Sequence, residues 1–393
     1  MTAIMKAVIL AAGEGNRLEP LTANRPKPMI PVANEPVLEY VVEAVADAGI
    51  DEIVLVVGYE RSRIQNHFGD GDDWDVAIEY AIQEKQLGTA HALLQARPHV
   101  DEPFLVLNGD RIIDPSAVEG VAAAFDDDTD AVATVTSVDI PTRYGVVDLE
   151  GDRVLGIREK PPAHEASTNL INAGVYAFRP GVFDRLGRTV AGTHDETGLP
   201  STLNDLATAG TVRGVRYDGR WLDLSYPWDL PFLNGRLLDD RDSPDLEGAH
   251  VSEDANVSAN VSIARGSRVR PFATIGRGVA LAENVTVGAG AVVSNAVVLA
   301  DATIGPGAVI EDAVIGQNAR VGANATIAGG RGDVVLEGTY HEDVRLGGVV
   351  GDNASLGADV TLVPATIVGT DATVESGLTL DRRVPPGTEV RRG

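Results

Sequence analysis

The sequence predicts an α/β protein in two parts: a Rossmann-like domain of alternating strands and helices, followed by a parallel β-helix. Two patterns carry the prediction. In the first half, short β-branched runs alternate with segments of helical spacing, and in the second half an aliphatic residue recurs every six positions. With 393 residues, 44% of them hydrophobic, the chain can bury two separate cores. We expect the first domain over residues 1–235, a polar linker over 236–248 and the β-helix over 249–393.

In the first half, four apolar runs are predicted to be strands and three segments helices. The expected strands are Lys6–Leu10, Glu52–Val57, Ala77–Ile82 and Phe104–Leu107; the expected helices are Pro36–Ala48, Ser62–Phe68 and Thr89–Ala96. This alternation indicates a mostly parallel sheet with helices on both faces. Ligands bind such sheets beyond the carboxyl ends of the strands. The loop at Gly13 and the turn at Asp110 both follow a strand at that edge.

In the second half, the aliphatic residues follow a hexapeptide repeat, which is the signature of a parallel β-helix. The repeat occupies Val251, Val257, Ile263, Val269, Ile275, Leu281, Val287, Val293, Val298, Ile304, Ile310, Ile315, Val321, Ile327, Val350, Leu356, Leu362, Val368, Val374 and Leu380. Twice the spacing shortens to five, and residues 329–348 interrupt the pattern. Three hexapeptides make one coil, so the 20 positions predict six or seven coils, enough for a self-supporting solenoid.

Charge and composition exclude several classes of protein. There are 32 Lys and Arg against 58 Asp and Glu, a formal net charge of -26, which repels nucleic acid and anionic membranes. The acidic residues are spread along the chain, as expected for a halophilic protein in a salt-rich cytoplasm. The absence of cysteine excludes disulfides and thiolate metal sites. No apolar run is long enough to span a membrane, so we expect a cytoplasmic enzyme.

A phosphate-binding loop is predicted directly after the first strand. Gly13 and Gly15 allow a tight backbone turn whose N–H groups can face a polyphosphate. Arg17 and Lys27 follow as fixed cations, Lys27 between two prolines. A GxG pattern alone is usually a plain turn. The buried strand before it and the two cations after it favour a phosphate cradle.

The sequences LAAGEGNRLEPLT (residues 10–22) and PKPM (26–29) resemble the sugar-1-phosphate nucleotidyltransferases. The family pattern is LAAGxGTRLxPLT, and its usual Thr is Asn16 here. Some members carry a C-terminal left-handed β-helix, among them bifunctional N-acetylglucosamine-1-phosphate uridylyltransferases. The resemblance implies a Rossmann-like (GT-A-like) nucleotidyltransferase domain with Arg17 and Lys27 as catalytic cations. It further implies nucleotide contacts at Leu10, Ala12, Gly13 and Gly15.

Three further segments resemble family motifs and extend the predicted site. The segment QEKQLGTAH (83–91) implies that Gln83 reads the edge of uracil or thymine, with Gly88 and Thr89 beside the base, and His91 as an ordinary helix residue. The motifs LNGD (107–110) and WLDLSYPWD (221–229) imply that Asp110 and Asp223 share one Mg²⁺, with Asp229 structural. The implied contacts to the sugar phosphate are Asn108, Tyr144, Gly145, Glu159, Lys160 and Asn172.

The implied reaction transfers UMP or dTMP from UTP or dTTP to a hexose 1-phosphate, glucose or N-acetylglucosamine, and releases pyrophosphate. The sugar phosphate is already an anion, so no general base is needed. The resemblance also implies a homotrimer, or a multiple of one, through the β-helix. Three alternatives stay open: a bifunctional enzyme that also acetylates amino sugars, a guanylyltransferase that makes GDP-mannose, and a non-catalytic regulatory homologue.

Acetyl transfer is disfavoured by the residues of the second half. The position of the acetylating branch's catalytic His holds Glu311, and residues 331–345 contain no lysine. His341 is the one local candidate for a general base. We therefore expect the β-helix to hold the subunits of the oligomer together.

Overall fold

The computed structural model describes residues 6–191, 198–210, 212–239 and 242–392, and it divides into two compact units. The first unit comprises Met1–Glu14, Pro26–Met29 and Val37–Asp223; the second comprises Gly15–Arg25, Ile30–Pro36 and Leu224–Gly393. Each is described by itself. The units confirm the predicted classes of fold, α/β and β-helix. Helix α7 (Asp229–Leu238) lies in the second unit and covers the start of the segment predicted as a linker.

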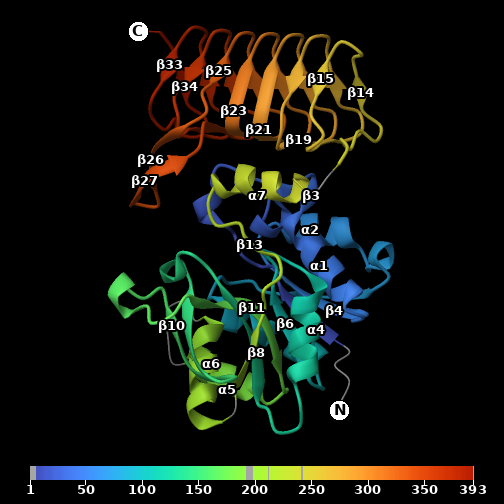
Figure 1. Cartoon of the computed structure of the whole chain (residues 1–393), viewed down its shortest axis with the longest axis vertical. Helices are drawn as coiled ribbons and strands as arrows, with labels where there is room; N and C mark the ends of the chain where they lie inside the picture. The colour runs from blue at the N-terminus through green and yellow to red at the C-terminus, as the bar shows by residue number, and fades with distance from the viewer. Residues whose placement is uncertain (1–5, 192–197, 211, 240–241, 393) are drawn as a thin grey trace. The chain divides into compact units, whose positions relative to one another are not determined.

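The first unit is built on a nine-stranded mixed sheet in the order β5-β4-β1-β6-β11-β8-β12-β10-β9 (Figure 1). Strands β5, β4, β1 and β6 are parallel, whereas β11 runs antiparallel to both β6 and β8. The strand bounds are β1 Lys6–Leu10, β4 Glu52–Val57, β5 Ala77–Ile82, β6 Phe104–Asn108, β8 Ala131–Ser137, β9 Gly145–Glu150, β10 Arg153–Glu159, β11 Leu170–Phe178 and β12 Val212–Arg216. The four predicted strands are therefore confirmed.

Both faces of this sheet are covered by helices, because its strands are apolar on both sides. Alternate residues of β1 enter opposite cores: Ile9 packs with the residues of one face and Val8 with those of the other. One face is covered by α1 (Val37–Asp47), α2 (Arg61–Phe68) and α4 (Pro115–Ala124). The other is covered by α3 (Thr89–Gln95), α5 (Val182–Ala191) and α6 (Leu199–Ala209).

A small antiparallel sheet at the carboxyl edge joins two distant parts of the chain. Strand β7 (Arg111–Ile113) follows the end of β6 after one tight turn. It pairs with β13 (Trp221–Asp223), so that Arg111 lies directly opposite Asp223. This pairing sets the position of both aspartates discussed below.

The second unit contains the β-helix, whose short parallel strands stack coil upon coil (Figure 1). The predicted aliphatic positions enter one continuous core: Val269 pairs with Val287, and Val287 with Ile304 on the next coil. The strand bounds are β14 His250–Val251, β15 Asn256–Val257, β16 Val261–Ile263, β17 Arg268–Val269, β18 Thr274–Ile275, β19 Val279–Leu281, β20 Thr286–Val287, β21 Val292–Val298, β22 Thr303–Ile304, β23 Val309–Ile315, β24 Arg320–Val321, β25 Thr326–Ile327, β28 Gly348–Val350, β29 Ser355–Leu356, β30 Thr361–Leu362, β31 Thr366–Val368, β32 Thr373–Val374, β33 Thr379–Leu380 and β34 Glu389–Val390.

The two shortened spacings have a structural reason. They fall in β21 and β23, which turn one corner of the coil without an intervening loop. Asn295 and Asp312 adopt positive φ angles of 43° and 49° at this corner. The Asn295 side chain donates to Asp312 Oδ1 at 2.6 Å, which links the corners of successive coils. Asn and Asp tolerate the left-handed conformation better than other side chains, so they mark the corner in the sequence.

The interruption in the repeat contains an antiparallel hairpin over residues 331–345. Strands β26 (Arg331–Leu336) and β27 (Thr339–Arg345) pair, with Arg331 opposite Arg345 at the open end. The hexapeptide rule could not find this hairpin, because its side chains lie outside the β-helix core.

Two short segments from the first 36 residues belong to the second unit. In Gly15–Arg25, the Arg25 guanidinium forms an ion pair with Asp352 at 2.7 Å, and both side chains are almost fully buried. In Ile30–Pro36, which holds β2 (Pro31–Val32) and β3 (Glu35–Pro36), the N–H of Ala33 donates to Asn234 of α7 at 2.9 Å. The β-helix unit therefore includes part of the predicted phosphate loop.

None of the described helices is long and apolar enough to cross a membrane.

Candidate functional site

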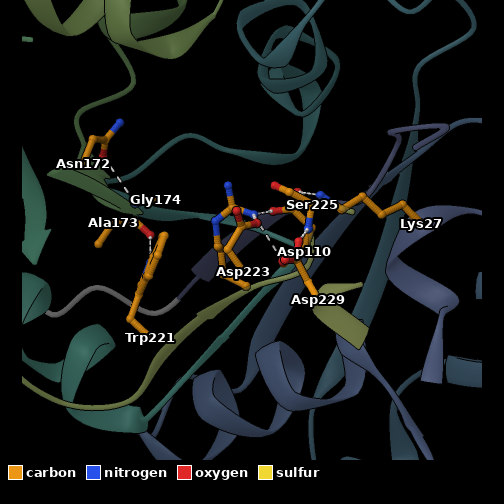
Figure 2. Close-up of polar contacts among 10 residues, drawn as sticks. Lys27, Asp110, Asn172, Ala173, Gly174, Trp221, Asp223, Ser225 and Asp229 are labelled. Atoms are coloured by element: carbon orange, nitrogen blue, oxygen red, sulfur yellow. Dashed lines mark hydrogen bonds and ion pairs between the residues drawn. The ribbon is translucent and has the colours of Figure 1, made fainter. Parts of the chain in front are cut away.

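Four charged side chains meet at the carboxyl edge of the sheet in the first unit (Figure 2). Lys27 Nζ lies 2.6 Å from Asp110 Oδ2, and Arg111 Nη1 lies 2.9 Å from Asp110 Oδ1. Arg111 also forms an ion pair with Asp223, whose side chain is 3% exposed. The β7–β13 pairing brings these groups together across 112 residues of chain. The predicted metal pair, Asp110 and Asp223, is thus bridged by one guanidinium.

The two cations control the ionisation of Asp110. Burial alone would raise the pKa of Asp110, but Arg111 and Lys27 outweigh burial and hold this pKa well below its ordinary value. Burial likewise opposes the charge of Arg111, and the carboxylates of Asp110 and Asp223 raise the Arg111 pKa instead. Asp110 and Arg111 therefore stay charged at neutral pH, and the site holds a dense, paired set of charges.

The predicted nucleotide loop begins beside this cluster. Gly109 donates its N–H to the carbonyl of Leu10 at 2.9 Å, and a Cβ at Gly109 would lie only 2.9 Å from that same oxygen. Glycine is therefore required where the Asp110 turn passes the loop. Gln86 Nε2 donates to the carbonyl of Ala12 at 2.6 Å and holds the loop from the other side.

The predicted base-reading residue, Gln83, is buried and oriented by two neighbours. Its Nε2 lies 3.2 Å from the carbonyl of Gly88 and 2.9 Å from Nδ1 of His91. Burial and the nearby Lys85 lower the pKa of His91, so the ring is neutral and can accept this hydrogen bond. Thr89 Oγ1 accepts from the N–H of Leu199 at the start of α6. His91 was expected to be an ordinary helix residue, but its ring contacts the Gln83 amide and orients it.

The predicted sugar-side residues Asn108 and Asn172 lie near the ends of β6 and β11. A Cβ at Gly174 would come within 2.6 Å of Asn108 Nδ2, and Gly174 has a φ angle of 87°, so only glycine fits there. Asn172 Oδ1 accepts from the N–H of Gly174 at 3.3 Å, while its Nδ2 donates to the hydroxyl of Tyr176 at 2.7 Å. Burial raises the pKa of Tyr176 to about 12, so this hydroxyl stays protonated.

The remaining predicted sugar-side residues are joined by the pairing of β9 with β10. Gly145 lies opposite Glu159, and the N–H of Lys160 donates to the carbonyl of Tyr144 at 3.0 Å. The Tyr144 ring packs edge-on against Trp221, with ring centroids 5.1 Å apart.

Trp221 connects the sugar side to the charged cluster. Its Nε1 donates to the carbonyl of Ala173 at 2.9 Å, and the Arg111 guanidinium lies 5.5 Å from its ring centre (Figure 2). The sequence analysis did not select Trp221 or Arg111 for the site. Trp221 opens the quoted motif WLDLSYPWD and could have been found there; Arg111 had no signal beyond following Asp110.

Gly15 and Arg17 belong to the second unit and are described with it. Gly15 has a φ angle of 79° and begins a short helical turn that contains Arg17. The Arg17 side chain is half exposed and lies 3.3 Å from Glu337 on the hairpin side of this unit. An ion pair between exposed groups contributes little and yields readily to another anion. The catalytic role of Arg17 stays a prediction.

Replacing Arg111 by leucine should raise the pKa of Asp110, because the two carboxylates would lose their shared counter-charge. In the parent protein, the lowered pKa means that Asp110 contributes fully to the free energy of unfolding above about pH 4, and this contribution is lost only as the pH falls through the lowered value. Carboxyl carbon NMR would follow the titration of Asp110, with Arg97→Leu, at an exposed ion pair, as the control. An unchanged Asp110 titration in Arg111→Leu would contradict the bridging role.

Comparison with known proteins agrees with this arrangement. Residues 6–230 match the family model described as Nucleotidyl transferase, and residues 257–391 match the model described as GMPPB C-terminal domain. A solved structure described as a putative glucose-1-phosphate thymidylyltransferase from Bacillus anthracis aligns with a TM-score of 0.54 at 26% identity, over 59% of this chain and 94% of that chain.

Two curated relatives are similar over long stretches. The "Bifunctional protein GlmU" of Methanococcus maripaludis (strain C5) is 34% identical over 402 residues, covering 96% of this chain and 95% of the relative. The "UTP--glucose-1-phosphate uridylyltransferase AglF" of Haloferax volcanii is 35% identical over 240 residues, covering 60% of this chain and 98% of the relative. The matched model spans more than half of the chain, and its range includes Lys27, Asp110 and Asp223. The chain therefore belongs to the nucleotidyl transferase family and is a nucleotidyltransferase, as the sequence predicted.

Proposed function

We propose that this enzyme transfers UMP from UTP to a hexose 1-phosphate and releases pyrophosphate. The observation that carries the proposal is the grouping of Lys27, Arg111, Asp110 and Asp223 at the sheet edge, next to the loop at Leu10. The names of the relatives support the substrate class, since one is a UTP–glucose-1-phosphate uridylyltransferase. Because the two N–H groups of the Gln83 amide are directed to Gly88 and His91, its carbonyl oxygen is the atom proposed to accept from the N3–H of uracil. The alternative nucleotide is dTTP, which differs by one methyl group.

The chemistry is a single in-line displacement at the α-phosphorus of the nucleotide. The bond from the sugar phosphate oxygen to phosphorus forms as the bond to pyrophosphate breaks, so no proton has to move. The barrier is the approach of two anions and the charge that develops on the leaving group. In this proposal Lys27 and Arg17 neutralise the phosphates, Lys160 meets the sugar phosphate, and Asn108, Tyr144, Gly145, Glu159 and Asn172 orient the sugar.

Members of this family generally use a divalent metal, and we propose Mg²⁺ held by Asp110 and Asp223. Among the described residues, no group of three or more His, Cys, Asp or Glu could enclose a metal ion. Two carboxylates nevertheless fit Mg²⁺, which is commonly held by one or two carboxylates and completes its shell with water and substrate phosphates. Arg111 lies between the carboxylates as a cation, which shows that this position stabilises positive charge. When bound, the metal would supply counter-charge to the phosphates.

Removal of either charge from the Lys27–Asp110 pair should abolish most activity while leaving the fold intact. For Lys27→Ala and Asp110→Asn we expect kcat to fall on the order of 10²–10³-fold, because the first change removes a cation that neutralises the phosphates and the second removes a ligand of the proposed Mg²⁺. Pyrophosphate release would be measured with each nucleoside triphosphate, Mg²⁺ and a panel of sugar 1-phosphates. Asp101→Asn, at an exposed position of the same unit, is the matched control. Near-normal turnover in both variants, with unchanged circular dichroism, would refute the proposal.

His91→Leu should weaken nucleotide recognition without slowing the chemical step. Without the ring nitrogen, Gln83 loses the partner that orients its amide, so the KM for UTP should rise about tenfold while kcat changes little. His91→Asn, whose side-chain oxygen can accept the same hydrogen bond, should recover part of the affinity. His67→Leu, at an exposed ion pair, is the control. An equal loss of kcat and of kcat/KM would assign His91 to the chemistry instead.

Three broader expectations belong to the same proposal. We propose that the β-helix assembles the enzyme into a homotrimer or a multiple of one, that the enzyme works in the cytoplasm where nucleoside triphosphates are made, and that its charge of -26 is an adaptation to high salt. Neither nucleic acid nor membrane is an expected partner.

Acetyl transfer by the β-helix is the second candidate function. One observation favours it: the relative that matches over nearly the whole chain is named a bifunctional protein. His341 packs against the rings of Tyr226 and Trp228, with centroids 4.9 and 5.1 Å away, and is the residue to test as a general base.

We expect no free CoA when acetyl-CoA and glucosamine 1-phosphate are added to the protein, because Glu311 holds the position of the family's His. Thiol release would be read with a colorimetric reagent, which works cleanly since the chain has no cysteine. CoA release that is lost in His341→Ala would establish the second activity.

A further inference from the structure

A pocket of about 630 Å³ is lined entirely by residues of the second unit, and its lining includes none of the residues described for the charged cluster of the first unit. Its walls come from three parts of the unit: helix α7 with the preceding Trp228, the β-helix corner at Arg277 and Asn295, and the open end of the β26–β27 hairpin. The volume is within the range typical of sites for small molecules.

The pocket is basic although the chain as a whole is strongly acidic. Its lining includes four arginines, Arg236, Arg277, Arg331 and Arg345, but only two carboxylates, Asp229 and Asp239. The Asp229 carboxylate already accepts from the N–H groups of Ser225 and Tyr226, at 3.0 and 2.7 Å. Asp239 accepts from Arg277 at 2.8 Å. Arginine outnumbers aspartate here in a protein with a net charge of -26, which favours an anionic ligand.

Two of the arginines are held in place by acidic residues that do not line the pocket. Arg331 and Arg345 face each other across the hairpin, an arrangement that like charges would destabilise without compensation. Asp343 balances Arg331 at 2.7 Å, and Asp312 balances Arg345 through two contacts of 3.1 Å. A guanidinium has five N–H donors, and these ion pairs use only some of them. Both side chains remain more than 60% exposed.

Arg236 differs from the other three arginines. Within the described part of the chain it has no ion pair, and its side chain is exposed on α7. A cation with no ion pair among the described residues, beside three guanidiniums that have one, is the group that a bound anion would stabilise most. Its replacement breaks no ion pair of that part of the chain, which makes it the best position to test.

One wall of the pocket is aromatic. Trp228 and Phe232 are four residues apart at the start of α7 and so share one side of the helix. The Phe232 side chain is 61% exposed, which is unusual for a phenylalanine. Trp228 is fixed by stacking on Tyr226, at 4.6 Å with the rings 7° from parallel. Rigid aromatic rings beside guanidiniums suit a ligand that carries both a planar ring and phosphate.

We propose that this pocket binds a nucleotide, with its phosphates on the arginines and its base against Trp228 and Phe232. The proposal concerns a second ligand site and does not depend on which reaction the first unit catalyses. It gives the β-helix unit a role in binding, beyond assembly.

Trp228 offers a local reporter, because the chain has three tryptophans and the other two, Trp74 and Trp221, lie in the first unit. In the full-length Trp74→Phe/Trp221→Phe protein, addition of ADP, UDP or GDP should change the fluorescence of Trp228 saturably for at least one of them. Arg236→Ala should weaken that binding about tenfold or more, since it removes a charge-assisted contact to phosphate. Arg270→Ala, an exposed β-helix arginine outside the pocket, should not.

Further controls distinguish binding of the phosphates by the arginines from binding of the base by the aromatic residues. Phe232→Ala should weaken nucleotide binding but not the weaker binding of inorganic phosphate. The proposal is wrong if none of the three nucleotides gives a saturable response, or if Arg236→Ala binds as tightly as Arg270→Ala. Inorganic phosphate that binds as tightly as the best nucleotide would overturn the role of the aromatic wall. A Phe232→Ala protein that changes its oligomeric state would show that this surface binds another copy of the chain, and would also overturn the proposal.

Discussion

The ion pair between Arg111 and the two carboxylates of Asp110 and Asp223 is the interaction on which the candidate active site depends. Asp110 lies in the turn that follows strand β6, whereas Asp223 lies 112 residues after Arg111. Two carboxylates at one sheet edge would repel each other. The Arg111 guanidinium attracts both of them, and this attraction outweighs their mutual repulsion. The β7–β13 pairing places Arg111 opposite Asp223, and the positive charge of Arg111 stabilises the two neighbouring carboxylates. Lys27 adds a second cation from a separate segment of the chain.

This arrangement also explains why the surrounding glycines and aromatic residues are needed. The Asp110 turn passes so close to Leu10 that only glycine fits at position 109. Glycine is likewise required at position 174, because a Cβ there would clash with the Asn108 side chain. Trp221 then contacts the Arg111 guanidinium, the Tyr144 ring and the carbonyl of Ala173. One indole ring thus contacts both the charged cluster and the proposed sugar side.

Much of the fold was predictable from the sequence, because each part of it depends on a repeated constraint. The β-helix core needs an aliphatic side chain at each repeat position. Val269, Val287 and Ile304, for example, each mark one strand of a successive coil in the sequence. The hairpin at residues 331–345 was not predictable, since its side chains obey no such period. In the site, Asp110 and Lys27 were found by motif, whereas Arg111 and His91 act only through the neighbours that folding brings to them. The basic pocket combines residues from three elements, and no local pattern marks it.

The buried ion pair between Arg25 and Asp352 bears on how modular the chain is. Arg25 ends the segment that carries Arg17, while Asp352 belongs to a coil near the far end of the β-helix. Cutting the chain after α7 would remove Asp352 and so separate Arg25 from its counter-ion. Because Gly15–Arg25 belongs to the same compact unit as the β-helix, truncation at this point would divide that unit rather than release a separate domain.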